Sequence, residues 1–366
     1  MDRTAPPPVL VSGYYGFGNL GDEAVLAGLL SAWQAQMPDA RVVVFSADPL
    51  ATRALHNVEA WSRAPLAVWR ALDRARALIS GGGSLVQDVT SARSALYYLG
   101  AMGAAQQRGL PVAVIGQGIG PLRRPWLRFL ARRIYQRATV VSVRDSDSAA
   151  SLVAMGVTRP VHRGADLAFL TAPARQGGVR GLLAQAGLDA AGLRIGVVVR
   201  DWPGLLTAAP MGELVGRFAR EKGAAVAVLP FHLGRDGPAS AAAASAAGGR
   251  VVAVATPQDL LALVGAMDLV VAARLHALVF AASVAVPAVG MAYDPKVTAF
   301  TAEVGLPPAL PVDASAEVVR RALGETWEAR GEVRRRLEDT VPALRHRATE
   351  SVGAAVGALA QAASVA

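Results

Sequence analysis

Basic side chains follow two apolar stretches in the second half of the chain, at the point where each stretch ends. Arg274 and His276 come after Asp268–Ala273, and Lys296 comes after the next apolar run. The chain has one other lysine, Lys222, and otherwise uses arginine, so Lys296 indicates a need for a compact ammonium group. A structural histidine is the alternative for His276. Together the three residues predict a pocket for a small anion with an acid or base beside it.

Arginines end two further apolar stretches. Arg144 follows Val143, and Arg200 precedes Asp201-Trp202 at the equivalent place in the second half. A guanidinium at a strand end can grip a phosphate or carboxylate with its planar fork. In so arginine-rich a chain the alternative is a solvated surface residue. With Arg144 added, the pocket predicted around Arg274, His276 and Lys296 suits a small polyanion.

Near the amino terminus a glycine motif follows the first apolar stretch. Its spacing, Gly16-x-Gly18-Asn19-x-Gly21-Asp22-Glu23, matches a dinucleotide fingerprint. However, two carboxylates at the start of the following helix would repel a pyrophosphate. One interpretation is a tight turn with Asp22 as N-cap. The other is that Asn19, Asp22 and Glu23 bind hydroxyl groups of a substrate or accept a proton from one.

Two more glycine-rich turns follow strand candidates. In Ser80-Gly81-Gly82-Gly83-Ser84 the missing side chains would let backbone amides approach a ligand, and Gln87-Asp88 comes shortly after. Gly116-Gln117-Gly118-Ile119-Gly120-Pro121 forms a similar elbow. Tight packing between a strand and a helix would explain either turn equally well.

An arginine-rich helix is predicted from Arg123 to Arg133. Arg124, Arg128 and Arg132 share one face, opposite an apolar face that includes Leu127 and Leu130. An ordinary surface helix is one interpretation. The other is a helix lying on a membrane surface, where the arginines meet anionic lipid or a lipid pyrophosphate.

These residues must be positioned by apolar strands that alternate with helices, a pattern typical of doubly wound α/β domains with parallel sheets. We expect an N-terminal domain over residues 1–172, a linker over 173–194, a second domain over 195–315 and a helical tail over 316–366. The strand candidates are Val9–Ser12, Arg41–Phe45, Ala77–Ser80, Val112–Gly116, Thr139–Val143, Ile195–Arg200, Ala225–Leu229, Val251–Val254, Leu269–Ala272 and Ala288–Met291. The alanine-rich stretch 239–249 is expected to be a loop or a helix end.

Composition narrows the function classes. The chain has 366 residues and no cysteine, which excludes disulfides and cysteine-based zinc sites. Its net charge of +9 favours anionic partners. We find no spacing that indicates a metal site and no motif that indicates nucleic-acid binding. The amino terminus shows no export signal, and Ala277–Tyr293 is expected to be a buried helix, a turn and a strand, so we expect a cytoplasmic protein.

In these motifs the chain resembles the polysaccharide pyruvyl transferase family, particularly its bacterial CsaB type. The resemblance includes the glycine motifs described above, Val143-Arg144-Asp145, Arg274-Leu275-His276 and Tyr293-Asp294-Pro295-Lys296. It runs from residue 13 to 296 in the order found in the family.

The resemblance implies two Rossmann-like domains facing across a cleft, as in GT-B glycosyltransferases. It also implies that phosphoenolpyruvate is the donor co-substrate, bound by Arg144, His276 and Lys296. We expect Arg274 to bind it as well and expect no other cofactor, while a metal requirement stays open. For the CsaB type the acceptor is N-acetylmannosamine of a lipid-linked cell-wall precursor. The product is a 4,6-linked pyruvate ketal that anchors surface-layer proteins. Contact with the inner face of the membrane would follow from such an acceptor.

The residue types agree with this chemistry. We expect His276 to protonate the donor and Asp22 or Glu23 to take a proton from the acceptor. We expect Asn19, Gly82 and Gly83 to contact the acceptor as well.

Two other functions stay open. A nucleotide-sugar glycosyltransferase of cell-envelope polysaccharide synthesis would have the same architecture, with an acidic ribose contact in the second domain. A non-enzymatic module that binds nucleic acid or anionic membrane would also suit the charge.

Overall fold

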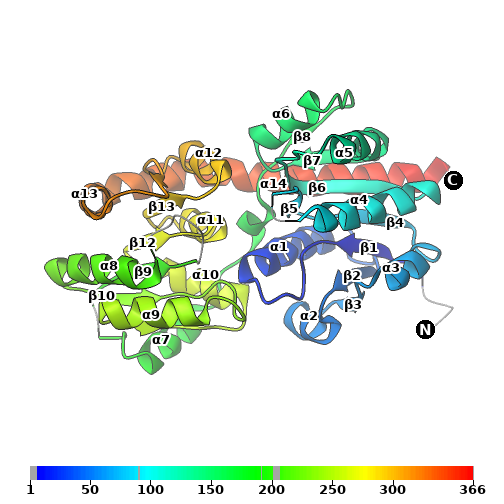
Figure 1. The fold of residues 1–366 in the computed structure, drawn as a ribbon. Coiled ribbons are helices and arrows are strands. Elements are labelled where there is room, and N and C mark those ends of the chain that lie inside the picture. The colour runs from blue at the N-terminus through cyan, green and yellow to red at the C-terminus, as the bar shows by residue number, and fades with distance from the viewer. Residues whose placement is uncertain (1–5, 90, 191, 201–206, 366) are drawn as a thin grey trace. The chain divides into compact units, whose positions relative to one another are not determined.

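The computed structural model describes residues 6–89, 91–190, 192–200 and 207–365, and Figure 1 shows its helices and strands. The chain forms two compact units. Unit 1 comprises the residues up to Phe17, Asp22–Thr171 and the residues from Leu344 onward, and unit 2 comprises Gly18–Gly21 and Ala172–Ala343. Each unit is built on a parallel sheet, so the prediction of two parallel-sheet α/β domains is confirmed.

In unit 1 the described strands run in the order β3-β2-β1-β4-β6-β7-β8, and β5 pairs with the far end of β6. The chain moves from β1 outward to β3 and then returns to β4, so the strand order reverses between β1 and β4. Ligands bind at such a switch point, beyond the carboxyl ends of the strands. The strands are β1 (Val9–Ser12), β2 (Val42–Ser46), β3 (Glu59–Ser62), β4 (Ala77–Ser80), β5 (Gly83–Val86), β6 (Val112–Ile119), β7 (Val140–Val143) and β8 (His162–Arg163). The helices are α1 (Leu20–Gln36), α2 (Pro49–His56), α3 (Pro65–Leu72), α4 (Ala92–Gln107), α5 (Pro125–Arg137), α6 (Ser146–Ala154) and the 3₁₀ helix η1 (Leu167–Leu170).

In unit 2 the described strands run in the order β11-β10-β9-β12-β13-β14, with the reversal between β9 and β12. The strands are β9 (Leu193–Val198), β10 (Ala224–Val228), β11 (Arg250–Val251), β12 (Leu269–Ala272), β13 (Ala288–Ala292) and β14 (Leu310–Pro311). The helices are α7 (Gln176–Gln185), α8 (Ala208–Lys222), α9 (Gly237–Ala247), α10 (Pro257–Gly265), α11 (Leu275–Ser283), α12 (Pro295–Val304) and α13 (Ala316–Glu328). The long helix α14 (Arg330–Val365) begins in unit 2 and ends in unit 1.

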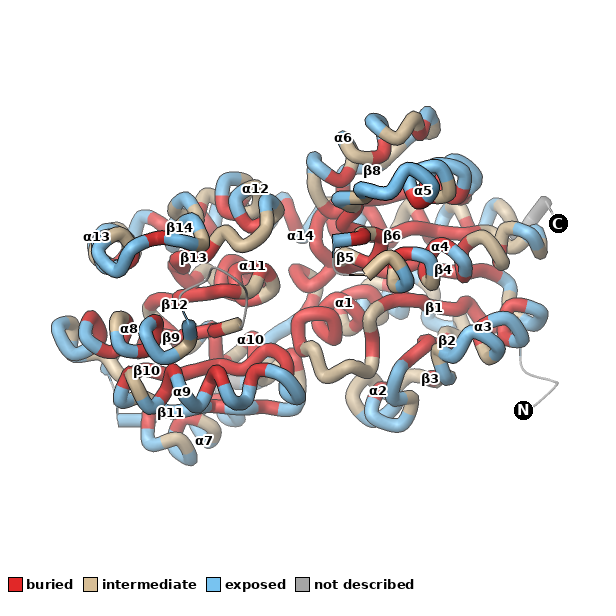
Figure 2. The backbone as a smooth tube through the Cα atoms, in the orientation of Figure 1, coloured by how far each residue is buried: buried red, intermediate tan, exposed pale blue. Residues whose placement is uncertain are grey.

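The central strands of both sheets are buried along their length, as Figure 2 shows in red. Val9–Ser12 and Leu269–Ala272 are buried at every residue, which is the burial that near-continuous apolar strands require when helices cover both faces of a sheet. Ala277–Tyr293 forms the buried helix α11 and strand β13, as its sequence predicted. No helix among the described residues is long and apolar enough to cross a membrane.

Three segments differ from the sequence-based expectation. Residues 173–194 carry helix α7 and the start of β9 and belong to unit 2, where the Ala174 N–H donates to Gln258 O. The alanine-rich stretch 239–249 lies mostly in helix α9, whose buried alanines pack against α8. The tail 316–366 is helical as predicted, but it is divided between the units, since the Oγ atoms of Ser351 and Ser142 form a hydrogen bond of 2.7 Å in unit 1. For α7 and α9, packing supplies the stability that the local sequence pattern did not show.

Candidate functional site

The predicted site residues divide between the two units. Unit 2 holds Asn19, Arg274, His276 and Lys296, whereas unit 1 holds Asp22, Glu23, Gly82, Gly83 and Arg144. In both units these residues follow strands or begin helices at the carboxyl edge of the sheet.

The site in unit 2 is organised by the buried carboxylate of Asp236. Its Oδ2 accepts the backbone N–H groups of Phe231 (3.1 Å) and His232 (2.8 Å). Its Oδ1 accepts a hydrogen bond from Nη2 of Arg274. Asp236 and His232 follow β10 and Arg274 follows β12, so this ion pair joins the loops on either side of β9.

Further basic groups surround Tyr293 at the same edge. The guanidinium of Arg200 lies over the Tyr293 ring, 4.9 Å from its centre, and Lys296 Nζ lies 6.0 Å from it. The Tyr293 hydroxyl accepts the N–H of Leu275, and Lys296 Nζ is 3.1 Å from Asp294 Oδ2. Burial lowers the pKa of Arg200, and the neighbouring Arg274 lowers it further. An anionic ligand relieves such repulsion between half-buried cations.

The Gly18–Gly21 segment belongs to this group. The Leu20 N–H donates to Phe231 O, and the Leu233 N–H donates to Gly18 O. At Gly21 the backbone passes so close to His276 that an added Cβ would stand 2.4 Å from Nδ1. Asn19, at the start of α1, accepts the Gly21 N–H through Oδ1 at 3.2 Å. The predicted acceptor residue Asn19 and the predicted acid His276 therefore flank Gly21 within one unit.

Sequence reasoning missed His232. This side chain is 7% exposed, and neither ring nitrogen has a hydrogen-bond partner among the described residues. Burial lowers its pKa, and the positive charges of Arg235 and Arg274 lower it further. The rule that selected His276, a polar residue shortly after an apolar strand, would also have selected His232, since Ala225–Leu229 was predicted as a strand.

In unit 1 the acidic residues Asp22 and Glu23 lie in the first turn of α1, where a helix favours negative charge. Asp22 is therefore not the N-cap, since α1 already begins at Leu20. Both carboxylate oxygens of Glu23 are engaged: Oε1 accepts the Gly16 N–H at 2.8 Å, and Oε2 lies 2.8 Å from Nε2 of buried His56. The structure thus gives Glu23 a positioning role in the glycine turn.

Asp22 lies beside the second glycine run. A Cβ added at Gly83 would stand 3.1 Å from Asp22 Oδ1, and one at Gly82 would stand 2.7 Å from a methyl carbon of Val25. Gly83 has a φ of +90° and begins β5. Close packing therefore requires glycine at position 82, and backbone conformation favours it at 83.

Arg144 is 6% exposed and is held by carboxylates. Its Nε lies 3.0 Å from Asp145 Oδ2, and its Nη1 lies 3.4 Å from Asp166 Oδ2. Its Nη2 donates to Ser84 Oγ at 3.1 Å. Burial would raise the pKa of Asp145, but Arg144 and Ser148 lower it overall. The predicted site residues of unit 1 and their contacts are therefore mostly acidic (Asp22, Glu23, Asp145 and Asp166 with Arg144), whereas those of unit 2 are mostly basic.

Neither Asp201 nor Trp202 can be placed in the site, because both lie outside the described residues. Among the described residues, no three histidine, aspartate or glutamate side chains are grouped so as to hold a metal ion.

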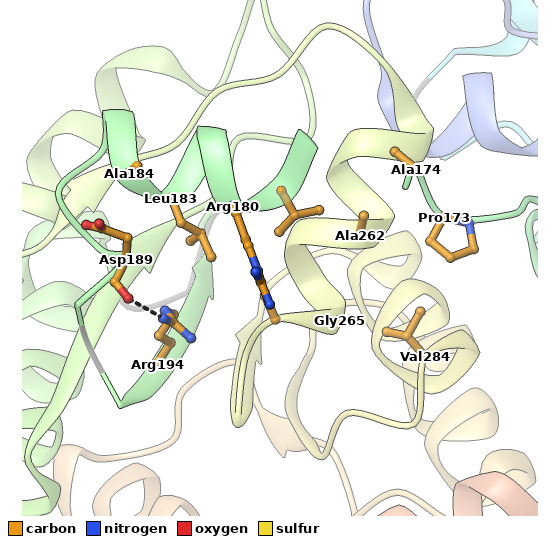
Figure 3. A pocket seen from close by; sticks show the side chains of 12 residues that line it. Pro173, Ala174, Arg180, Leu183, Ala184, Asp189, Arg194, Ala262, Gly265 and Val284 are labelled. Carbon is orange, nitrogen blue, oxygen red and sulfur yellow. Dashed lines mark hydrogen bonds between the residues drawn. The ribbon is translucent and has the colours of Figure 1, made fainter. Parts of the chain in front are cut away.

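A pocket of about 620 Å³ lies at the opposite edge of the sheet in unit 2 (Figure 3). It is lined by Arg194, at the start of β9, and by Val284, beyond the end of α11. Arg180 extends into it from α7, and Arg194 Nη2 donates to the carbonyl oxygen of Asp189. The pocket contains none of the predicted site residues, so it is not part of the candidate site.

Comparison with known proteins identifies a family. Residues 19–295 match the model described as polysaccharide pyruvyl transferase. No curated protein matches the chain.

Similar solved structures span nearly the whole chain. The UDP-GlcNAc 2-epimerase from Neisseria meningitidis is 13% identical, with a TM-score of 0.63 over 96% of this chain and 99% of that one. The wall teichoic acid polymerase TagF is 10% identical, with a TM-score of 0.60 over 96% and 89%. The ADP-heptose heptosyltransferase II from E. coli is 14% identical, with a TM-score of 0.52 over 88% and 99%. At these identities the similarity shows the fold, which is the GT-B type.

The positioning role of Glu23 predicts a loss of stability when its side chain is removed. Glu23→Ala leaves buried His56 and the Gly16 N–H without their partner, which should lower the free energy of unfolding by about 3 kcal/mol. The matched control is Glu350→Ala, which breaks the exposed Glu350–His346 pair in the same unit and should cost less than about 0.5 kcal/mol. Urea unfolding measures both, and equal losses would contradict the assignment.

The lowered pKa of His232 predicts a pH dependence of stability. Protonated His232 is disfavoured in the folded chain, whereas in the unfolded chain its pKa has the usual value of about 6.5. At a pH between these two pKa values the unfolded state therefore binds more protons than the folded state. The contribution of neutral His232 to the free energy of unfolding is fully present above about pH 6.5. It is lost as the pH falls from there through the lowered pKa of His232 in the folded chain. His232→Gln should therefore lose less stability than wild type between pH 7.5 and 5.5 in thermal unfolding. Exposed His162→Gln is the control and should follow wild type; identical losses in all three proteins would refute the role of burial.

Proposed function

Because the chain belongs to the polysaccharide pyruvyl transferase family, we propose that it transfers pyruvate from phosphoenolpyruvate to two hydroxyls of a sugar. The product is a 4,6-linked ketal, and phosphate is released. As in the CsaB type, we take the acceptor to be N-acetylmannosamine of a lipid-linked cell-wall precursor, whose ketal anchors surface-layer proteins. The observation that supports this donor most directly is the group of Arg200, Arg274 and Lys296, which we call the basic group of unit 2.

The donor carries a carboxylate and a phosphate, so its site needs several cations. Arg200, Arg274 and Lys296 meet that need at the switch point of the unit 2 sheet, and a guanidinium suits either anionic group. Asp236 pairs with Arg274 and Asp294 with Lys296, so these cations are held in place by carboxylates of their own unit. Cations fixed before the ligand arrives also stabilise the charge that develops on a departing phosphate.

In the proposed reaction His276 delivers a proton to the methylene carbon of the donor, which becomes the methyl group of the ketal. The first sugar hydroxyl then bonds to C2. The second hydroxyl bonds to the same carbon as the C–O bond to phosphate breaks. Two hydroxyl protons are released: one replaces the proton that His276 gave, and the other leaves with inorganic phosphate. An imidazole suits the transfer because its ordinary pKa is near neutrality.

The acidic group of unit 1 suits the acceptor. Asp22 is our candidate for the base that takes a hydroxyl proton, and Glu23, bonded to Gly16 and His56, positions the turn before it. Asn19, Gly82 and Gly83 are assigned to the acceptor as well. The family resemblance also assigns Arg144 to the donor. Because its guanidinium already contacts Asp145 and Asp166, we assign it one end of the donor at most.

The donor assignment can be tested by thermal unfolding in the presence of ligands. Phosphoenolpyruvate should raise the midpoint in proportion to the logarithm of its concentration, since it binds only the folded state. UDP and GDP sugars should leave the midpoint unchanged. A shift with a nucleotide sugar and none with phosphoenolpyruvate would favour the glycosyltransferase alternative. A shift with neither, together with salt-sensitive binding to nucleic acid or lipid, would favour a binding module.

Turnover is tested by phosphate release from phosphoenolpyruvate with candidate lipid-linked disaccharides, with and without a chelator to determine any metal requirement. His276→Ala should lower the rate at least about a hundredfold, the usual contribution of a positioned general acid. Its shift of the unfolding midpoint with phosphoenolpyruvate should stay close to that of wild type. Exposed His346→Ala is the control and should behave as wild type. Unchanged turnover in His276→Ala would remove this imidazole from the mechanism.

A further inference from the structure

The part of unit 1 around α5 is strongly basic. From Val89 to Arg144 the sequence contains nine arginines and no aspartate or glutamate. Six of these arginines lie between Arg123 and Arg137, on or just before α5. Surface charges of both signs normally mix, so this run of one sign indicates an anionic partner.

Helix α5 is amphipathic, but its outward face is not simply polar. Leu127, Ala131, Ile134 and Tyr135 are buried against the unit 1 core. On the opposite side Trp126 is 50% exposed and Phe129 is 61% exposed. Figure 2 shows much of α5 in pale blue, the colour of exposed residues.

The same helix also exposes three arginines, and one of them lies over an exposed ring. Arg128, Arg132 and Arg133 are all exposed, and the Arg133 guanidinium lies 5.7 Å from the centre of the Phe129 ring. Trp126, Phe129 and Arg133 recur at helical spacing of three and four residues, so they share the outward face. We call Trp126, Arg128, Phe129, Arg132 and Arg133 the α5 surface.

The start of α5 is firmly held. The buried carboxylate of Asp88 accepts the N–H groups of Arg123 at 2.8 Å and Arg124 at 2.9 Å. Burial would raise the pKa of Asp88, but these bonds and the Arg124 guanidinium lower it overall. Because α5 follows β6, its first turn lies at the carboxyl edge of the sheet, the edge that also carries Asp22 and Gly83. The neighbouring helix α4 adds Arg93 and Leu96, both exposed near its own start.

We propose that the α5 surface docks on an anionic lipid bilayer. Exposed aromatic rings enter the boundary between headgroups and acyl chains, and the exposed arginines of the same helix bind lipid phosphates. A lipid surface offers both partners at once, whereas a phosphate backbone alone leaves the rings in water. The proposal agrees with the lipid-linked acceptor of the proposed function, but it requires no phosphoenolpyruvate chemistry.

The test is sedimentation of the full chain with vesicles of phosphatidylcholine, with or without one quarter phosphatidylglycerol. Wild type should bind the anionic vesicles, bind neutral vesicles far less and be released by high salt. Trp126→Ala/Phe129→Ala should weaken binding at least about tenfold, because the rings no longer insert. Arg128→Gln/Arg132→Gln/Arg133→Gln should weaken it about a hundredfold, because three basic contacts are lost.

Leu66→Ala/Trp69→Ala is the matched control. These side chains on α3 of the same unit are 60% and 50% exposed, and the Arg108 guanidinium lies 4.0 Å from the centre of the Trp69 rings. The control should bind anionic vesicles within about twofold of wild type. The proposal would be overturned if wild type did not sediment with anionic vesicles, if the control lost as much binding as the α5 variants, or if the α5 variants bound like wild type. It would also be overturned if the α5 variants lost only self-association or binding to single-stranded nucleic acid.

Two further measurements separate the possible failures. Thermal unfolding shows whether each α5 variant is folded. If the aromatic variant is unfolded, the arginine variant still tests the proposal. Phosphate release with a water-soluble acceptor analogue should be the same in wild type and the α5 variants. If wild type released no phosphate, the result would count against the proposed function. The membrane proposal would then be decided by vesicle sedimentation alone.

Discussion

The basic group of unit 2 depends on the ion pair between Asp236 and Arg274. A buried carboxylate needs several partners to offset its lost hydration, and Asp236 has three: two backbone N–H groups after β10 and the guanidinium after β12. Since β9 lies between those strands, the pair fixes the loops on both sides of the switch point. The same loop after β10 pairs with Gly18–Gly21, which passes over His276. One carboxylate therefore holds both the backbone at His232 and the guanidinium of Arg274 in place.

The predicted site residues and their contacts differ in charge between the two units. In unit 2, Arg200, Arg274 and Lys296 lie near Asp236 and Asp294, a group that suits the doubly charged donor of the proposed function. In unit 1, the acidic side chains of Asp22, Glu23, Asp145 and Asp166 accompany Arg144, a group that suits the hydroxyl of the proposed acceptor. Acid–base pairs work when their surroundings push them toward opposite protonation states. This difference in charge agrees with the roles proposed for His276 as acid and Asp22 as base.

Much of the fold could be predicted because each strand of a buried parallel sheet is visible in the sequence as a short apolar run. Val9–Ser12, Ala77–Ser80 and Leu269–Ala272 were predicted with the bounds observed, and the polar residues after such strands were therefore found. The partners of those residues could not be predicted. Asp236 reaches Arg274 across 38 positions, and no periodicity marks such a pair. Helix α7 was missed for a related reason: its glycines disfavour a helix, and contact with α10 outweighs that preference.

The glycine motif shows how one spacing can arise from different physical requirements. In a dinucleotide site the glycines let the backbone approach a pyrophosphate. Here Gly16 has a φ of +77°, and an added Cβ would stand 2.0 Å from Ser46 Oγ. Gly21 has no such φ and is required only because His276 lies beneath it. The motif thus joins a turn held by Glu23 to a segment that covers His276. This accounts for carboxylates directly after the last glycine, because that glycine faces an imidazole rather than a phosphate.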